Sequence, residues 1–121
     1  MAKILVIDDE ASAREILKRI LEGVGHKVLC INDGVYAEKV IRAYGPDLIV
    51  CDIMMPEVDG LILTNSLKYD SEFDKIPIIL LTALGEENSY LGSQVNADCY
   101  MAKPFDEDKL LEKVDELLYS D

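Results

Sequence analysis

The sequence predicts a doubly wound α/β fold, in which five parallel β-strands alternate with five α-helices in a (βα)5 order. Five short segments rich in Val, Ile and Leu recur along the 121 residues, and segments with the apolar spacing of helices separate them. The strand-like segments are continuously apolar, which is typical of parallel strands that helices cover on both faces. Right-handed crossovers and one reversal of strand order then predict a five-stranded parallel sheet with the order 2-1-3-4-5.

The strands are predicted at five apolar runs, of which the last is the least apolar: residues 3–7, 28–31, 48–51, 78–81 and 98–102. The first helix follows the first run, because apolar residues recur at the spacing of one helical face from Ala13 to Leu21. Gly23 and Gly25 then end this helix.

The other four helices fill the remaining gaps between strands. The second covers residues 37–44 and ends at Gly45-Pro46. The third begins near Asp59, a favoured N-cap residue. The fourth, at about 86–95, is weakly patterned, whereas the fifth has a clear apolar face over 110–118.

Length and composition indicate one globular domain over residues 1–121. Half of the residues are hydrophobic and 30% are charged, but no apolar run approaches the ~20 residues that a membrane helix needs. Three acidic residues at 8–10 interrupt the first apolar run, so no signal peptide is predicted. We therefore expect a cytoplasmic protein without membrane contact.

The charge balance limits the classes of partner. Twelve basic and 24 acidic residues give a net charge of −12, which would repel a phosphate backbone and argues against direct nucleic-acid binding. Residues 10–27 carry a net charge of +1 and residues 105–121 a net charge of −5. The first helix is therefore the least repulsive place for a partner of acidic or mixed charge.

Three cysteines, Cys30, Cys51 and Cys99, form no CxxC pair, and each lies in a strand-like run. Burial as small hydrophobic side chains explains them better than metal binding or redox chemistry.

Polar residues at the strand ends carry the predicted chemistry. In an open α/β sheet, the functional crevice lies beyond the carboxyl ends of the strands, near the switch in strand order. The first, third and fourth strands are neighbours in the predicted order, so their ends converge there. We expect a cluster of carboxylates, a hydroxyl and an amine from Asp8, Asp9, Glu10, Asp52, Thr82 and Lys103.

Each of these residues has a structural explanation when it is taken alone. Asp8 or Asp9 could cap the first helix, because Asp is a favoured N-cap residue. Thr82 could begin a helix, and Lys103 could be a solvated lysine. Their combination favours a site, because the acidic strand ends belong to neighbouring central strands.

The residue types indicate a metal-assisted phosphoryl site. Clustered carboxylates repel one another unless a cation joins them, and hard oxygen ligands suit Mg²⁺. Lysine and metal together would attract a phosphoryl group, and a carboxylate can itself act as the nucleophile that forms an acyl phosphate.

Four separated motifs resemble those of response-regulator receiver domains, in that family's order and spacing. They are residues 4–10 (ILVIDDE), residues 47–60 with DLIVCDIMMP and the later Asp59-Gly60, residues 77–83 (PIILLTA) and residues 100–105 (YMAKPF). The resemblance covers the whole chain and implies a flavodoxin-like fold. It also implies a signalling domain with at most self-phosphotransfer and autodephosphorylation activity, and not an enzyme.

The resemblance implies that Asp52 accepts a phosphoryl group from a phosphohistidine on a sensor histidine kinase or a phosphotransfer protein. It implies that Asp9, Asp52 and the Met54 carbonyl ligate Mg²⁺, whereas Asp8 acts mainly through water. Thr82 and Lys103 would each hold a phosphoryl oxygen, and the Lys103-Pro104 bond is expected to be cis.

The resemblance further implies a switch. The Thr82 hydroxyl would move toward the phosphate, and the Tyr100 ring would swing inward behind it; the alternative for Tyr100 is a core aromatic with a solvated hydroxyl. The face formed by residues 86–95, 98–102 and 110–118 would then meet a downstream protein target or an output domain. A phosphorylation-dependent dimer, and the choice between a stand-alone regulator and part of a longer protein, stay open.

Two apolar positions bear on the lifetime of the acyl phosphate. Met54 lies two residues after Asp52, and Leu84 lies two residues after Thr82. In similar proteins the side chains at these places flank the phosphoryl group and affect attack by water. With no polar side chain at either position, we expect a long-lived acyl phosphate.

Other classes of protein fit less well. A phosphatase of the haloacid dehalogenase type needs a second acid where Met54 stands, and a flavodoxin-like FMN carrier would place its phosphate against residues 8–10. The GxxxxGK[ST] motif of P-loop enzymes is missing. The remaining alternative is a receiver-like interaction module that works without phosphorylation.

Overall fold

The computed structural model describes residues 1–55, 59–83 and 97–119. Five strands form one sheet with the order β2-β1-β3-β4-β5, and all four neighbouring pairs are parallel. Both the fold class and the predicted strand order are therefore confirmed. The strands are β1 (Lys3–Ile7), β2 (Lys27–Ile31), β3 (Leu48–Asp52), β4 (Ile78–Ala83) and β5 (Cys99–Lys103).

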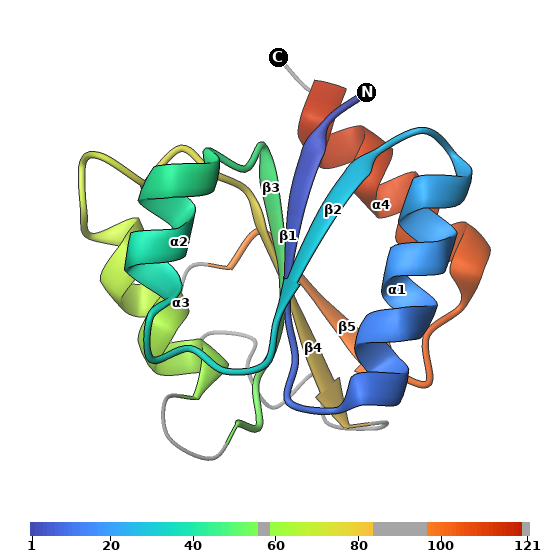
Figure 1. Ribbon diagram of the computed structural model, residues 1–121, viewed down its shortest axis with the longest axis horizontal. Coiled ribbons are helices and arrows are strands. Elements are labelled where there is room, and N and C mark those ends of the chain that lie inside the picture. The colour runs from blue at the N-terminus through green and yellow to red at the C-terminus, as the bar shows by residue number, and fades with distance from the viewer. Residues whose placement is uncertain (56–58, 84–96, 120–121) are drawn as a thin grey trace.

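Four described helices cover the two faces of the sheet: α1 (Ala11–Gly23), α2 (Ala37–Tyr44), α3 (Gly60–Lys68) and α4 (Glu107–Tyr119). Helices α2 and α3 lie on one face, and α1 and α4 lie on the other (Figure 1). The helix predicted at residues 86–95 lies outside the described residues. The fifth predicted helix corresponds to α4.

A separate hydrophobic core lies on each face. The β1 side chains alternate between them: Leu5 and Ile7 belong to the core beneath α2 and α3, whereas Ile4 and Val6 belong to the core beneath α1 and α4. All five β3 residues are buried. This burial on both faces explains why the strands are continuously apolar in sequence.

The ends of the helices follow the sequence signals closely. Asp59 caps α3, and its Oδ1 accepts a hydrogen bond of 3.0 Å from the Ile62 backbone N–H. Gly45 follows α2 with a φ of 66°, a left-handed conformation that glycine adopts without strain.

Helix α1 begins earlier than its apolar pattern, at Ala11. Glu10 occupies its N-cap position without a side-chain capping bond. Neither Asp8 nor Asp9 therefore caps this helix, and the structural explanation considered for these two aspartates is wrong.

Two further expectations need adjustment. Cys51 is buried, but Cys30 and Cys99 are only half-buried, because β2 and β5 are the edge strands of the sheet. Strand β4 extends to Ala83, so Thr82 lies inside the strand and opposite Ala102 of β5.

Among the described residues, no helix has the length and apolar character needed to cross a bilayer.

Candidate functional site

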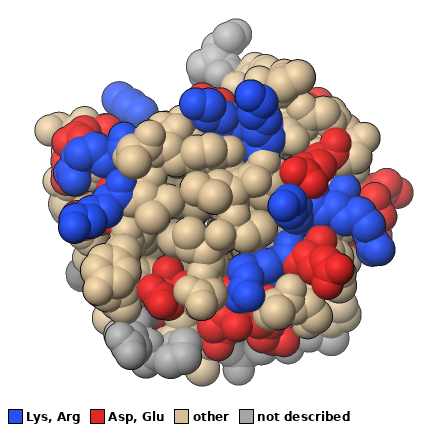
Figure 2. Space-filling model, in the orientation of Figure 1, with Lys and Arg blue, Asp and Glu red and all other residues tan. Residues whose placement is uncertain are grey.

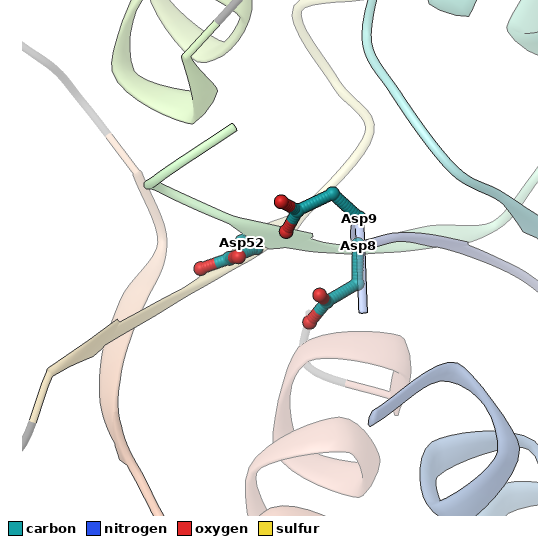
Figure 3. A group of neighbouring side chains, drawn as sticks. All are labelled: Asp8, Asp9 and Asp52. Carbon is teal, nitrogen blue, oxygen red and sulfur yellow. The ribbon is translucent and has the colours of Figure 1, made fainter. Parts of the chain in front are cut away.

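The structure brings together the three aspartates predicted to form an acidic cluster. Asp8 and Asp9 directly follow β1, and Asp52 ends the neighbouring strand β3, because Ile7 is paired with Cys51. One carboxylate oxygen from each aspartate lies within 4.8 Å of the other two. Figure 3 shows the three side chains together at the carboxyl ends of these two strands.

Asp8 is fully buried, and both of its carboxylate oxygens accept hydrogen bonds. Its Oδ1 accepts one from the Glu10 backbone N–H at 2.9 Å, and its Oδ2 accepts one from Lys103 Nζ at 2.8 Å. Its backbone N–H donates to the Ile31 carbonyl at 3.2 Å. These bonds hold Asp8 in one orientation and allow its charge to be buried.

Lys103, the last residue of β5, joins the acidic groups. Besides Asp8, its Nζ lies 3.5 Å from Asp52 Oδ2 and 3.7 Å from Glu10 Oε1. Burial alone would lower the pKa of Lys103, but the hydrogen bond and negative charge of Asp8 raise it above its ordinary value, with support from the other two carboxylates. Lys103 therefore stays protonated. The Lys103-Pro104 bond is cis, as predicted.

Asp52 is 6% exposed, and its environment disfavours the charged form. Burial, followed by the negative charge of Asp8, raises the pKa of Asp52 to about 6. The Lys103 charge and a hydrogen bond from the Met54 backbone act in the opposite direction. One lysine thus compensates the buried carboxylates only in part, and a further cation would favour the ionised form.

The cluster has the donor set of a site for a hard divalent cation. All three groups offer carboxylate oxygens, and Asp9 is exposed to solvent, so one side of the cluster is open. Mg²⁺ binds to such sites through one or two carboxylates and keeps several waters. The residues present therefore fit a magnesium ion.

Three other predicted site residues, Thr82, Tyr100 and Met54, lie within the described part of the chain. Thr82 is 3% exposed in β4, the strand that lies next to β3. Tyr100 is half-buried in β5 and packs against the core beneath α2 and α3. The Met54 side chain is 72% exposed. Leu84 lies outside the described residues.

One contact at the site was not predicted. Arg14 Nη1 of α1 donates a hydrogen bond of 2.8 Å to the Asp8 backbone carbonyl. The sequence holds only a weak signal for it, namely a long basic side chain one helical turn after Glu10, at the start of the helix that follows the acidic run.

The comparisons with known proteins agree on one family. The family model described as "Response regulator receiver domain" matches residues 4–115. The chain is 41% identical over 116 residues to the phosphate regulon transcriptional regulatory protein PhoB of Pseudomonas aeruginosa, covering 95% of this chain and 51% of PhoB. It is 36% identical over 119 residues to the DNA-binding dual master transcriptional regulator RpaA of Synechocystis, covering 98% of this chain and 49% of RpaA. The chain thus spans about half the length of these relatives.

Solved structures show the same likeness in three dimensions. The response regulator TrrA of Thermotoga maritima, determined in complex with Mg²⁺ and BeF, has a TM-score of 0.86 and 38% identity, with 98% of this chain and 100% of that chain covered. The chemotaxis response regulator CheY4 of Vibrio cholerae has a TM-score of 0.86 and 29% identity, with 98% and 99% covered. With this fold and family match, the chain belongs to the response regulator receiver domains of two-component systems.

Proposed function

We propose that this receiver domain accepts a phosphoryl group on Asp52 from a phosphohistidine of a sensor histidine kinase or a phosphotransfer protein. The observation that carries the proposal is the position of Asp52, a strand-end carboxylate beside Lys103 and two further aspartates. Phosphoryl acceptance is typical of the family to which the chain belongs.

In the proposed transfer, an Asp52 carboxylate oxygen attacks the phosphorus atom of the phosphohistidine. A P–O bond forms as the P–N bond breaks, and the bonding electrons of the broken bond stay on the imidazole nitrogen, which is protonated from solvent. The product is an acyl phosphate on Asp52. Because an attacking carboxylate must be ionised, the groups that keep Asp52 charged support the reaction.

Asp9, Asp52 and the Met54 backbone carbonyl would hold Mg²⁺, and Asp8 would contribute through water. The bound ion would supply positive charge that draws the phosphoryl oxygens and the carboxylate together. The TrrA structure contains Mg²⁺ and BeF, which supports this choice of metal. Lys103 Nζ, already among the carboxylates, would bind one phosphoryl oxygen, and the Thr82 hydroxyl another.

Phosphorylation is proposed to change the protein surface formed by β5 and α4. Thr82 and Tyr100 occupy the adjacent strands β4 and β5, so a movement of the hydroxyl toward the phosphate can be passed to the ring. The altered surface of β5 and α4 would then contact a downstream protein or an output domain, or pair with a second receiver. A DNA-binding output domain is one such partner, because relatives of about twice this length are transcriptional regulators.

We also propose that the acyl phosphate is long-lived for this family. The apolar and exposed Met54 side chain cannot orient a water molecule toward the phosphorus. Replacing Met54→Asn together with Leu84→Glu should accelerate autodephosphorylation. An unchanged hydrolysis rate in this double variant would contradict the proposal that these apolar residues prolong the acyl phosphate.

The first test is intact mass after incubation with acetyl phosphate and Mg²⁺. We expect a gain of about 80 Da, one phosphoryl group, in the wild type. The gain should be lost in Asp52→Asn and kept in Asp108→Asn, which changes an exposed carboxylate of α4. A folded wild-type protein that gains no mass would favour the alternative, an interaction module that works without phosphorylation.

A further inference from the structure

We propose that Arg14 is a positioning residue for the metal site, which fixes the Asp8–Asp9 peptide so that the Asp9 carboxylate faces the cluster. Arg14 touches neither the acceptor nor the proposed ion, and it acts through the backbone. The inference rests on the proposed Mg²⁺ site and adds a residue from α1 to it.

The geometry supports a role in orientation. The Asp8 carbonyl oxygen that accepts the 2.8 Å bond from Arg14 Nη1 belongs to the peptide group that joins Asp8 to Asp9. A bond to this oxygen restricts rotation of the peptide plane, and that plane sets the direction in which the Asp9 side chain leaves the backbone.

Arg14 is itself anchored at two further points. Its backbone N–H donates to the Glu10 carbonyl at 3.1 Å within the first turn of α1. Its own carbonyl accepts a hydrogen bond of 3.8 Å from the Cys30 thiol of β2. The guanidinium therefore holds the Asp8 carbonyl from a helix that is fixed to the sheet.

Asp9 needs such support more than Asp8 does. Both carboxylate oxygens of Asp8 are held, one by the Glu10 backbone N–H and the other by Lys103. The Asp9 side chain is exposed, and among the described residues no hydrogen bond restrains its carboxylate. Its place in the cluster depends on the backbone that carries it.

A positioning role and a simple charge effect predict opposite results. Arg14 is a cation near a proposed cation site, so by electrostatics alone its removal would strengthen Mg²⁺ binding. If Arg14 orients Asp9, its removal weakens Mg²⁺ binding instead. Groups that orient a metal ligand typically contribute about tenfold or more to metal affinity.

The experiment titrates the whole chain with MgCl₂ alone and measures binding by isothermal titration calorimetry. We expect Arg14→Met to raise the dissociation constant roughly tenfold and Arg14→Lys to raise it by less. Arg19→Met, which removes the same charge from an exposed position of α1, should bind Mg²⁺ at least as tightly as the wild type. Circular dichroism checks the fold of each variant, and Arg14→Lys carries the test if Arg14→Met does not fold.

A second readout separates orientation from damage to the acceptor. With acetyl phosphate, Arg14→Met should need more Mg²⁺ for half-maximal phosphorylation, by the same factor as its loss of affinity, and should reach nearly the wild-type rate at saturating Mg²⁺. Unchanged or tighter Mg²⁺ binding by Arg14→Met would overturn the positioning role alone. A wild-type chain that binds no Mg²⁺ would overturn the proposed metal site and this inference with it.

Discussion

At the scale of single residues, the site is a balance between burial and compensation. Asp8 is fully buried, yet it lies 2.8 Å from Lys103 Nζ and accepts hydrogen bonds at both oxygens. Asp52 has less compensation, and burial and the nearby Asp8 raise its pKa to about 6. An acceptor that is held partly uncompensated has more to gain from an added cation than a fully paired carboxylate would have.

This imbalance predicts that Asp52→Asn stabilises the protein at pH 7.5 without Mg²⁺. The pKa of Asp52 rises from 3.8 to about 6 on folding, so its ionisation opposes folding above pH 6. At ~1.4 kcal/mol per pKa unit, this shift corresponds to about 3 kcal/mol in the free energy of unfolding. Because the site is open to solvent on the Asp9 side, we expect Asp52→Asn to gain only about 1 to 2 kcal/mol of stability.

The gain should shrink as the pH falls through 6 and be lost below about 3.8, where Asp52 becomes protonated in both the folded and the unfolded wild type. Urea denaturation at pH 7.5, 5.5 and 4 measures it, with Asp108→Asn as a control on an exposed carboxylate. A gain that is independent of pH would contradict this origin.

Thr64 gives a second prediction at this scale. Its Oγ1 is buried, and within the described part of the chain it has no hydrogen-bond partner. Thr64→Val keeps the shape and removes the unsatisfied group, so the free energy of unfolding should stay constant or rise by up to about 1 kcal/mol. Ser66→Ala is the matched comparison, because Ser66 donates a 2.9 Å bond to Glu38, and its loss should lower stability slightly. A clear loss of stability in Thr64→Val would show that the hydroxyl is bonded in solution.

At the scale of elements, the sequence predicts features that belong to a single strand or helix, such as its position and the residues at its end. The apolar runs locate the strands, and the residues that end them, such as Asp52 and Lys103, fall beside each other because parallel strands end at the same edge. Contacts between side chains of distant elements have no such pattern. The ion pair of Lys68 with Asp98, at 2.8 Å, joins α3 to the residue before β5, and neither residue had a sequence signal.

The same limit applies to Arg14 and to the start of the first helix. The contact of Arg14 with the Asp8 carbonyl depends on the path of the loop between β1 and α1, which periodicity does not specify. The helix begins at Ala11 although its apolar face starts later, because solvent-facing polar residues in the first turn carry no hydrophobic signal.

The start of α3 predicts a strong effect of Gly60→Ala. Gly60 donates a 2.8 Å backbone bond to the Ile53 carbonyl, and a Cβ at this position would overlap the Asp52 carbonyl oxygen. We expect a loss of about 2 kcal/mol in unfolding free energy, because the backbone must move. That movement would displace Asp52, so phosphorylation by acetyl phosphate should also slow.

Gly23→Ala is the control for this substitution. Gly23 ends α1, and nothing lies within 4 Å of a Cβ placed there. Alanine should stabilise this position by about 0.5 to 1 kcal/mol, because it restricts the unfolded chain and favours the helix. Equal effects at both glycines would contradict the close approach at Gly60.

At the scale of the whole molecule, the charge is divided unevenly along the chain. Residues 1–45 contain seven acidic and seven basic side chains, so the net charge of −12 belongs entirely to residues 46–121. The face over β2, α1 and α2 accordingly shows basic and acidic side chains interspersed around an uncharged centre (Figure 2). Repulsion among acidic groups is therefore concentrated in the half that contains β3, β4, β5 and α4.

This distribution predicts two separable effects of salt on thermal stability. NaCl should raise the melting temperature by screening the repulsion, in the wild type and in Asp9→Asn alike. MgCl₂ at equal ionic strength should raise it further only in the wild type, because a ligand at ten times its dissociation constant adds about 1.4 kcal/mol, or about 5 °C for a domain of this size. Differential scanning calorimetry of both proteins in both salts measures the difference. If the wild type has equal melting temperatures in the two salts, charge screening alone explains the rise in melting temperature. That result would contradict a specific magnesium site at Asp9 and Asp52.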